Sequence, residues 1–182
     1  MIQRAFFAPS TLSIVPASRS VLYWAVQSED RTILLEEQVM PTRSSSAVWR
    51  GGLKSGKGTL KIGKGAYEGS YSFPSRFEEG DGTNPEELLA ASHAGCLSMA
   101  LAAGLERSGT PAAEISTRAS ATLEKVGEAF RVTRMKLEVR GKVPGITAAA
   151  FQEAAEKAKE GCPISNALKN NVAFELDARL EN

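Results

Sequence analysis

The chain contains only two cysteines, and they stand in different local settings. Cys96 lies in the middle of a long apolar run with helical spacing, whereas Cys162 begins a short helical pattern directly before Pro163. A helix N-terminus favours a thiolate through the helix macrodipole, and a thiol in the middle of a helix receives no such help. The sequence therefore predicts a buried thiol at position 96 and a thiol at position 162 that ionises more readily. This is the layout of a reactive and a resolving cysteine.

Composition and charge narrow the class of protein. A formal net charge of +1 over 182 residues provides no field to attract nucleic acid or an anionic membrane. Uninterrupted apolar stretches fall short of the roughly 20 residues that a membrane span needs. Two cysteines and one histidine do not make a disulfide scaffold and are too few for a usual structural zinc site. We expect no metal or other cofactor, no nucleic acid, no membrane contact and a cytoplasmic location.

The first 39 residues differ from the rest, because no acidic residue precedes Glu29 while arginines and serines are present. One interpretation is a transit-type targeting segment. The other is a stretch translated ahead of a natural start at Met40, which the ordinary folded sequence after that residue favours. We expect residues 1–39 to be a poorly packed or disordered extension and residues 40–182 to form one domain. Local structure in the extension is expected at most in 20–27 and 32–35.

The strongest helix signal of the domain begins at Asn84, a good N-cap. Pro85 suits the first helical position, and Glu86 and Glu87 suit the positive end of the dipole. Glu87 can also serve as the acidic member of a capping box. The helix should run to about Ser108, and because it is apolar on most faces we expect it to be central.

Segments with strand patterns precede and follow this helix in the sequence. Short runs broken by glycine predict a small meander, followed by a loop, and two long alternating runs joined by a four-residue link predict a hairpin. Two further helices and a last strand complete an α+β domain. The expected strands are 47–49, 58–62, 66–73, 115–125, 130–142 and 172–180; the loop is 74–82, and the later helices are 147–160 and a short one after Cys162.

The segments around both cysteines resemble the OsmC/Ohr family of organic hydroperoxide reductases, and its OsmC branch most. The resemblance covers Trp49 to about Arg179 and leaves residues 1–39 without a counterpart. It implies an intertwined homodimer in which antiparallel sheets wrap around long central helices. The matching segments are Trp-Arg-Gly-Gly at 49–52, Arg-Phe-Glu at 76–78, Thr-Asn-Pro-Glu-Glu-Leu at 83–88, His-Ala-Gly-Cys at 93–96, Val-Pro-Gly-Ile at 143–146 and Cys-Pro-Ile-Ser at 162–165.

The resemblance also implies the roles of four residues. Cys96 would be the peroxidatic thiolate and Cys162 the resolving thiol, while Arg76 would hold Cys96 ionised and Glu86 would orient Arg76. The implied activity is reduction of organic hydroperoxides to alcohols through a Cys96 sulfenic acid and a Cys96–Cys162 disulfide. An external dithiol, such as a lipoyl-type reductant, would restore the thiols, and the protein would protect against oxidative and osmotic stress.

The spacing of these residues bears on where the site lies. Glu86 precedes Cys96 by ten positions, which is about 15 Å along one straight helix. Arg76 can hardly bridge both within one chain, although a mid-helix thiol needs a permanent cation to ionise. If the three share a site, the helix that carries Glu86 comes from a partner subunit. The site then lies at a dimer interface, and its apolar walls favour organic peroxides.

Two other functions remain open at this point. His93 lies three residues before Cys96, so it can tune the thiol or be a polar core residue, and it permits a Cys–His hydrolase or acyltransferase. A non-catalytic protein that binds lipid or another small ligand is the third class. Replacement of Cys162 separates these, because only a peroxidase needs a second thiol for multiple turnovers.

Overall fold

A computed structural model describes residues 25–28, 31–34 and 41–181, and the chain divides into compact units 1–43 and 44–182. In the first unit, β1 (Ala25–Ser28) pairs antiparallel with β2 (Arg31–Leu34). This hairpin overlaps the two patches where local structure was expected, 20–27 and 32–35. The remainder of the expected extension lies outside the described residues, so its packing stays a prediction.

The second unit begins with an antiparallel meander of β3 (Ser45–Arg50), β4 (Lys57–Ile62) and β5 (Tyr67–Ser72). Gly58 stands between Trp49 and Tyr71 in the register of these strands. A Cβ at position 58 would lie 2.1 Å from the Tyr71 ring, so only glycine lets that ring lie across β4. The rings of Trp49 and Tyr71 are consequently 5.2 Å apart.

A short helix, α1 (Phe73–Phe77), occupies part of the segment predicted as a loop. Ser72 caps it, because the Ser72 hydroxyl accepts from the Ser75 amide and the Ser75 hydroxyl accepts from the Ser72 amide. A proline in the first turn strengthens the start. The prediction was wrong here because serine replaces the usual acidic residue of a capping box. The helix positions Arg76 in its last turn.

The long helix α2 (Pro85–Arg107) begins at Asn84 as predicted, and the Asn84 side chain accepts from the Glu87 amide at 2.8 Å. The predicted capping box is wrong. The Glu87 carboxylate accepts from the hydroxyl of Thr83 at 2.9 Å, which provides a nearby donor that the pattern did not consider. The helix ends one residue before the predicted position.

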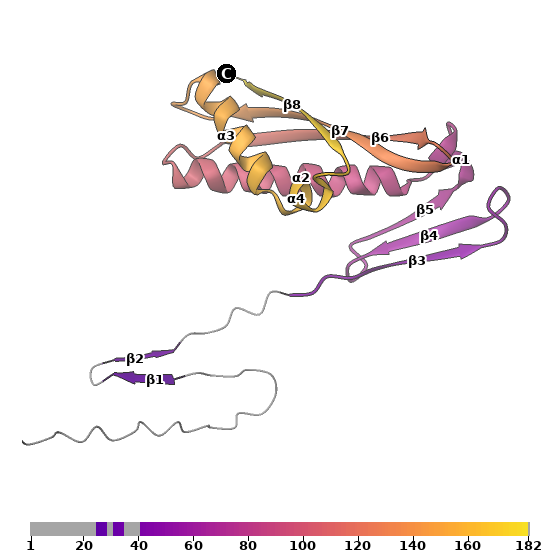
Figure 1. Cartoon of the computed structure of the whole chain (residues 1–182), viewed down its shortest axis with the longest axis horizontal. Helices are drawn as coiled ribbons and strands as arrows, with labels where there is room; N and C mark the ends of the chain where they lie inside the picture. The colour runs from indigo at the N-terminus through magenta and orange to yellow at the C-terminus, as the bar shows by residue number, and fades with distance from the viewer. Residues whose placement is uncertain (1–24, 29–30, 35–40, 182) are drawn as a thin grey trace, which may run out of the picture. The chain divides into compact units, whose positions relative to one another are not determined.

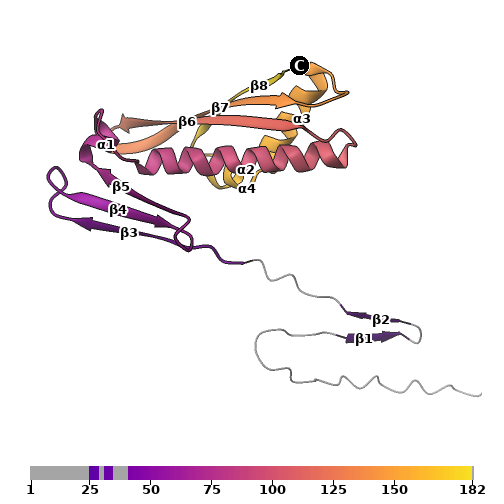
Figure 2. The same cartoon turned by 180° about the vertical axis from the view of Figure 1, so that it is seen from behind.

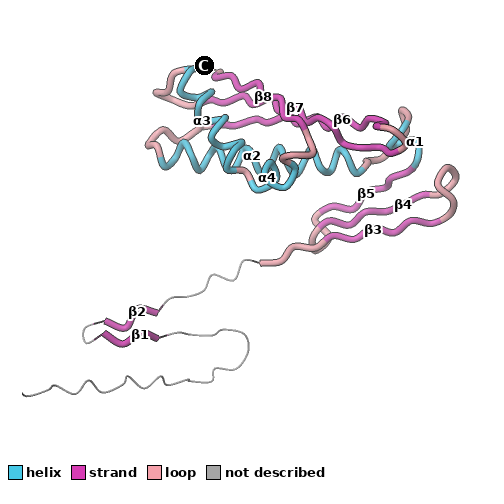
Figure 3. The backbone as a smooth tube through the Cα atoms, in the orientation of Figure 1, coloured by secondary structure: helices cyan, strands magenta, loops and turns pink. Residues whose placement is uncertain are grey.

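The last sheet combines β6 (Glu114–Val126), β7 (Ala129–Lys142) and β8 (Ala173–Leu180). β6 and β7 form the predicted hairpin, but Val126 pairs with Ala129, so the link is two residues rather than four. β8 pairs parallel to β7, so the sheet is mixed. The parallel pairing arises because α3 (Ala148–Gly161) and α4 (Pro163–Leu168) carry the chain back before β8 begins. Figure 3 shows this grouping of strands and helices, which confirms an α+β fold.

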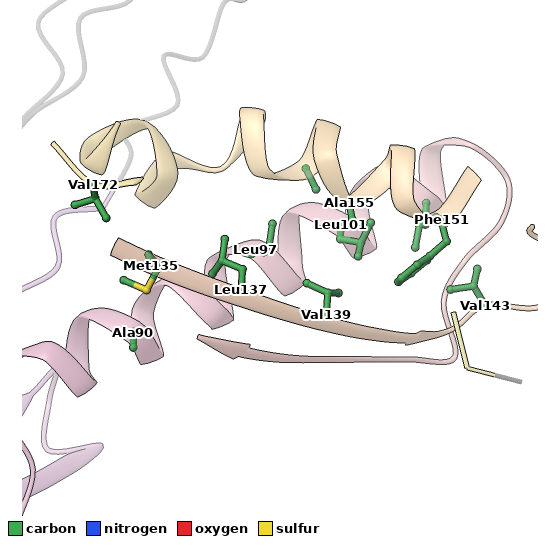
Figure 4. Close-up of a cluster of buried hydrophobic side chains, with 12 residues drawn as sticks. Ala90, Leu97, Leu101, Met135, Leu137, Val139, Val143, Phe151, Ala155 and Val172 are labelled. Atoms are coloured by element: carbon green, nitrogen blue, oxygen red, sulfur yellow. The ribbon is translucent and has the colours of Figure 1, made fainter. Parts of the chain in front are cut away.

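The core lies between one face of this sheet and the helices α2 and α3 (Figure 4). Alternate residues of β7, Met135, Leu137 and Val139, are completely buried, whereas the intervening residues are not. Phe151 of α3 packs against Gly141, where an added Cβ would meet the ring at 2.4 Å. One sheet face is therefore covered by helices, and Figure 2 shows the same arrangement from behind.

Only one side of α2 contributes to this core. Its buried residues recur at helical spacing: Ala90, His93, Leu97, Leu101 and Leu105. The opposite side carries the exposed residues Ala91, Gly95, Met99 and Ala102, and Met99 is 75% exposed. An apolar stripe on the helix is thus uncovered within one chain.

The composition of α2 also corrects the expectation that no apolar stretch reaches the length of a membrane span. By length and mean hydropathy, which is 1.6 over its best window, this helix meets the criteria for a membrane span. Serine, histidine and glycine residues interrupt the apolar residues of α2, so no uninterrupted apolar run in the sequence indicated this helix. Within the chain, 28% of that window is buried.

Candidate active site

The fold brings the two cysteines together although 66 positions separate them. Cys96 projects from the middle of α2, and Cys162 lies at the junction between α3 and α4. Their Sγ atoms are 3.0 Å apart, and both residues are free thiols. A disulfide can therefore form between them with a sulfur movement of about 1 Å.

The prediction that Cys96 is the buried thiol is wrong. Cys96 is partly exposed, whereas Cys162 is 0% exposed. The reason is that Cys96 lies at the margin between the covered and uncovered sides of α2, whereas Cys162 lies at the junction of α3 and α4. A periodic apolar pattern does not show which side of a helix its own chain will cover.

The pKa values of the two thiols shift in opposite directions. Burial and the hydrogen bond shared with Cys162 raise the pKa of Cys96, and the Ile164 amide acts in the opposite direction. Burial also acts to raise the pKa of Cys162, but the bond with Cys96 and nearby donors of Ser165 and Ile164 outweigh it and lower the pKa. Cys162 is the N-cap residue of α4, although its Sγ makes no full capping hydrogen bond. Within one chain, Cys162 is therefore the thiol that ionises more readily, as predicted.

His93 is completely buried and lies on α2 one turn before Cys96. Its Nε2 is 2.8 Å from the Oγ of Ser165, and its ring meets the edge of Phe174 at 5.4 Å. Its Nδ1 has no hydrogen-bond partner within the described part of the chain, and burial lowers the pKa of the imidazole. The neutral ring thus contacts Ser165 rather than the Cys96 thiol.

Arg76 and Glu86 form a second cluster. Arg76 Nη2 donates to Glu86 Oε1 at 2.7 Å and Arg76 Nε donates to Glu86 Oε2 at 3.2 Å. This bidentate pair fixes the plane of the guanidinium, which also lies 5.1 Å from the centre of the Phe77 ring. The side chain of Glu86 is 12% exposed and that of Arg76 is 36% exposed, so the arginine keeps an open side.

An apolar pocket of about 250 Å³ lies directly beside this arginine. Four aromatic rings dominate its wall, so a hydrocarbon group can bury itself there with the guanidinium at its edge. The residues that line it are Trp49, Leu53, Tyr71, Ser72, Phe73, Arg76, Phe77 and Pro85.

The structure brings the four predicted site residues together as two pairs, not as one cluster. Arg76 is paired with Glu86 of its own chain, and no arginine acts on the Cys96 thiol within the described residues. Ten helical positions, about 15 Å of rise, separate the two pairs along α2. The sequence did not single out Ser165, although its place three residues after Cys162 is that of a capping partner.

The described ranges 25–28, 31–34 and 41–181 hold no cluster of three or more His, Cys, Asp or Glu side chains able to bind a metal ion. The functional groups present are a close thiol pair and a positioned guanidinium. An α+β domain with two free cysteines held within bonding reach is a candidate thiol redox protein.

Comparison with known proteins defines the family. The model of OsmC-like proteins matches residues 78–177, and the chain belongs to this family. Peroxiredoxin OsmC of Escherichia coli (strain K12) is 41% identical over 138 residues, which cover 75% of this chain and 96% of that protein. The Organic hydroperoxide resistance protein of Xanthomonas axonopodis pv. citri is 36% identical over 99 residues, 53% of this chain and 67% of that protein.

A solved structure gives the same result for the fold. The organic hydroperoxide resistance protein from Elizabethkingia anophelis, with crystallant-derived thiocyanate bound, is 25% identical with a TM-score of 0.62. The match covers 78% of this chain and 99% of that one. The resemblance and the fold class predicted from the sequence are thereby confirmed, and the homodimer stays a prediction.

Proposed function

We propose that this protein is a thiol-dependent peroxidase that reduces organic hydroperoxides to alcohols. The observation that carries the proposal is the Cys96–Cys162 pair, whose sulfur atoms lie 3.0 Å apart as free thiols. The names of the curated relatives, a peroxiredoxin and an organic hydroperoxide resistance protein, support the same chemistry. Two free thiols also support the cytoplasmic location that we propose, because that compartment keeps thiols reduced.

The cycle begins at Cys96, the more accessible of the two sulfurs. Its thiolate attacks the distal oxygen of the peroxide, the O–O bond breaks, and the alkoxide takes a proton and leaves as alcohol. Cys96 becomes a sulfenic acid, which Cys162 attacks to form a disulfide and release water. An external dithiol then returns two electrons by thiol exchange.

The first step requires a cation, because burial raises the pKa of this thiol, and no cation acts on Cys96 among the residues described in its own chain. We propose that Arg76 of a partner subunit supplies it, held in place by Glu86 of that same partner. The paired guanidinium supports this role because it stays charged when partly buried and has donors left for a peroxide. Each subunit of a homodimer then contributes one half of each of two sites.

The uncovered side of α2 supports such a dimer. Ala91, Gly95, Met99 and Ala102 form an exposed apolar stripe in the middle of the helix, next to Cys96. Small residues there permit close approach of a second helix. Burial of this stripe in a second copy would remove apolar surface from water and place a partner's residues beside the thiol.

The aromatic pocket beside Arg76 supports organic rather than hydrogen peroxide as substrate. A hydrocarbon substituent gains free energy from burial there, about 25 cal/mol per Å² of apolar surface, whereas hydrogen peroxide has no such group. The pocket and the guanidinium together match a substrate with one apolar end and one polar end.

The competing hydrolase receives no support from the geometry. A Cys–His hydrolase needs an imidazole within reach of its nucleophile, but His93 Nε2 is engaged with Ser165 at 2.8 Å. The close approach of Cys162 to Cys96 would also have no purpose in a hydrolase or a ligand carrier.

A peroxide consumption assay tests the proposal directly. Cumene hydroperoxide and hydrogen peroxide are compared as substrates, each with a dithiol and a monothiol reductant. We expect faster consumption of cumene hydroperoxide, and only with dithiol. Equal turnover in Cys162→Ser, or no turnover of either peroxide, would refute the two-thiol peroxidase.

A further inference from the structure

His93 is a costly residue for a core position. It is 0% exposed, and its Nδ1 has no hydrogen-bond partner among the residues that the structure describes. An unpaired polar atom in the interior destabilises a fold, so an apolar side chain against Phe174 would serve packing better. Among the described residues, the side chain of His93 makes one polar contact, with the hydroxyl of Ser165 at 2.8 Å.

Ser165 connects this histidine to the second cysteine. Cys162 is the N-cap residue of α4 and Ser165 is the third residue of that helix, where a side chain turns back toward the N-cap. The Ser165 hydroxyl helps to lower the pKa of Cys162. Cys162 in turn lies 3.0 Å from Cys96. Measured contacts thus join His93 to Ser165 and Cys162 to Cys96, and the two pairs meet at the first turn of α4, where Ser165 follows Cys162 by three positions.

The direction of the hydrogen bonds among these residues follows from the unpartnered nitrogen. Burial lowers the pKa of His93, so the ring is neutral and carries one proton. An orphaned N–H in a protein interior is rarer than an orphaned lone pair, so the proton belongs on Nε2. Nε2–H then donates to Ser165 Oγ, and the serine hydroxyl is free to donate to Cys162 Sγ.

We propose that Ser165, oriented by His93, makes Cys162 the sulfur that leaves when a dithiol reduces the Cys96–Cys162 disulfide. In thiol–disulfide exchange, the sulfur that is better stabilised as a thiolate leaves faster. Access acts in the same direction, because Cys96 is partly exposed and Cys162 is 0% exposed. His93 and Ser165 are thus positioning residues that decide which sulfur the reductant attacks. The inference rests on the proposed peroxidase cycle.

Reduction of the disulfide by a dithiol takes two exchange steps. A thiolate of the dithiol attacks Cys96 Sγ, a new S–S bond forms, and the Cys96–Cys162 bond breaks with its electron pair on Cys162. The serine hydroxyl stabilises the Cys162 thiolate. The second thiol of the reductant then attacks the mixed disulfide, which releases Cys96 as a thiolate and the reductant as a cyclic disulfide. Among the described residues, the titratable groups of the His93–Ser165 and Cys162–Cys96 pairs are the two thiols and His93.

Ser165→Ala tests the role of the hydroxyl. We expect reduction of the oxidised enzyme by dithiol to slow by about ten- to a hundredfold, the effect of losing one hydrogen bond to a charged group. The rate of the first peroxide oxidation, which breaks no bond to Cys162, should change much less than the rate of reduction. Ser98→Ala is the matched control, because it removes another partly buried serine hydroxyl of the same unit, bonded to Thr117 at 2.8 Å. An equal loss in the control, or no loss in Ser165→Ala, would overturn the proposal.

His93→Gln tests whether the histidine is a donor or a base. Glutamine can donate to Ser165 but cannot titrate near neutral pH, so we expect reduction to remain within a few-fold of the wild-type rate and its pH profile to keep its shape. A loss as large as that of Ser165→Ala in a folded variant would overturn the donor role.

Two readouts separate this inference from the peroxidase proposal. In Cys96→Ser, the ultraviolet absorbance of the thiolate gives the pKa of Cys162, which should rise when Ser165→Ala is added, whether or not the wild type consumes peroxide. In oxidised wild type, brief treatment with a monothiol and rapid alkylation should place the mixed disulfide on Cys96. A mixed disulfide on Cys162, or an unchanged pKa of Cys162 in the Ser165→Ala variant, would contradict the proposed role of Ser165.

Discussion

The two halves of the candidate site differ in how completely one chain builds them. Around the thiols, α2 and α4 place Cys96 against Cys162 and His93 against Ser165. Around the cation, α1 and the start of α2 place Arg76 and Glu86 in a bidentate pair beside an open apolar pocket. Within the part of the chain that the structure describes, the thiol half has no cation and the cation half has no thiol. Two complementary halves about 15 Å apart on one helix are what the proposed dimer with shared sites requires.

Replacement of the nucleophile gives the largest expected effect, because it leaves the cation half with no reacting partner. Cys96→Ser preserves the size of the side chain, so the dimer should remain folded while peroxide turnover is lost. Circular dichroism and size-exclusion chromatography report on folding and assembly. A residual rate above about a tenth of the wild type would place the nucleophile elsewhere.

Removal of the cation should slow peroxide attack by orders of magnitude at neutral pH. Arg76→Met keeps much of the stem but loses the charge, so the pKa of Cys96 should return to the raised value that burial alone produces. The thiolate fraction grows with pH, and the rate should therefore recover partly in alkaline buffer. Stopped-flow oxidation across a pH series measures this effect.

Glu86→Gln is the matched variant for the same series, because it keeps the charge of Arg76 but weakens its orientation. Its effect should have the same sign and a smaller size. A pH profile in Arg76→Met that equals the wild-type profile would show that Arg76 does not act on the thiol.

Removal of the resolving thiol should abolish repeated turnover but spare the first one. Cys162→Ser should reduce one equivalent of peroxide without dithiol and then stall, because the sulfenic acid has no nearby thiol and oxidises to sulfinic acid. Intact mass spectrometry should find added oxygen on Cys96. An unmodified protein after peroxide treatment would contradict the assignment.

Complementation tests whether the two halves belong to different chains. In an equal mixture of Arg76→Met and Cys96→Ser, half of randomly formed dimers are mixed and each rebuilds one whole site, so about a quarter of the wild-type sites should return. Activity is measured after subunit exchange. Mixtures that stay inactive despite exchange, or full activity in monomeric protein, would rule out shared sites while leaving the redox chemistry intact.

The smallest expected effect concerns the segment before the domain. A chain that starts at Met40 should keep the melting temperature and activity of the full chain, because the domain fold begins after this residue and the catalytic residues all lie within 44–182. Differential scanning calorimetry is the measurement. A fall of several degrees would show that residues 1–39 pack on the domain.

Local patterns were sufficient for much of the fold. The N-cap at Asn84, the hairpin of β6 and β7, and the short helix after Cys162 follow from capping residues and alternation that depend on near neighbours. The helix α1 was missed because a serine pair caps it in place of an acidic residue. The parallel pairing of β8 with β7 was not visible either, since register between distant strands depends on the path of the intervening helices.

The sequence by itself determined the family of the protein, through segments that contain two cysteines, an arginine and a glutamate. Only the tertiary structure decided how they combine. It showed that Cys162 rather than Cys96 is the buried thiol, that Arg76 is held by Glu86 of its own chain, and that His93 contacts Ser165. These contacts join residues between 10 and 72 positions apart, and such distances are set by the packing of whole elements, which no local pattern encodes.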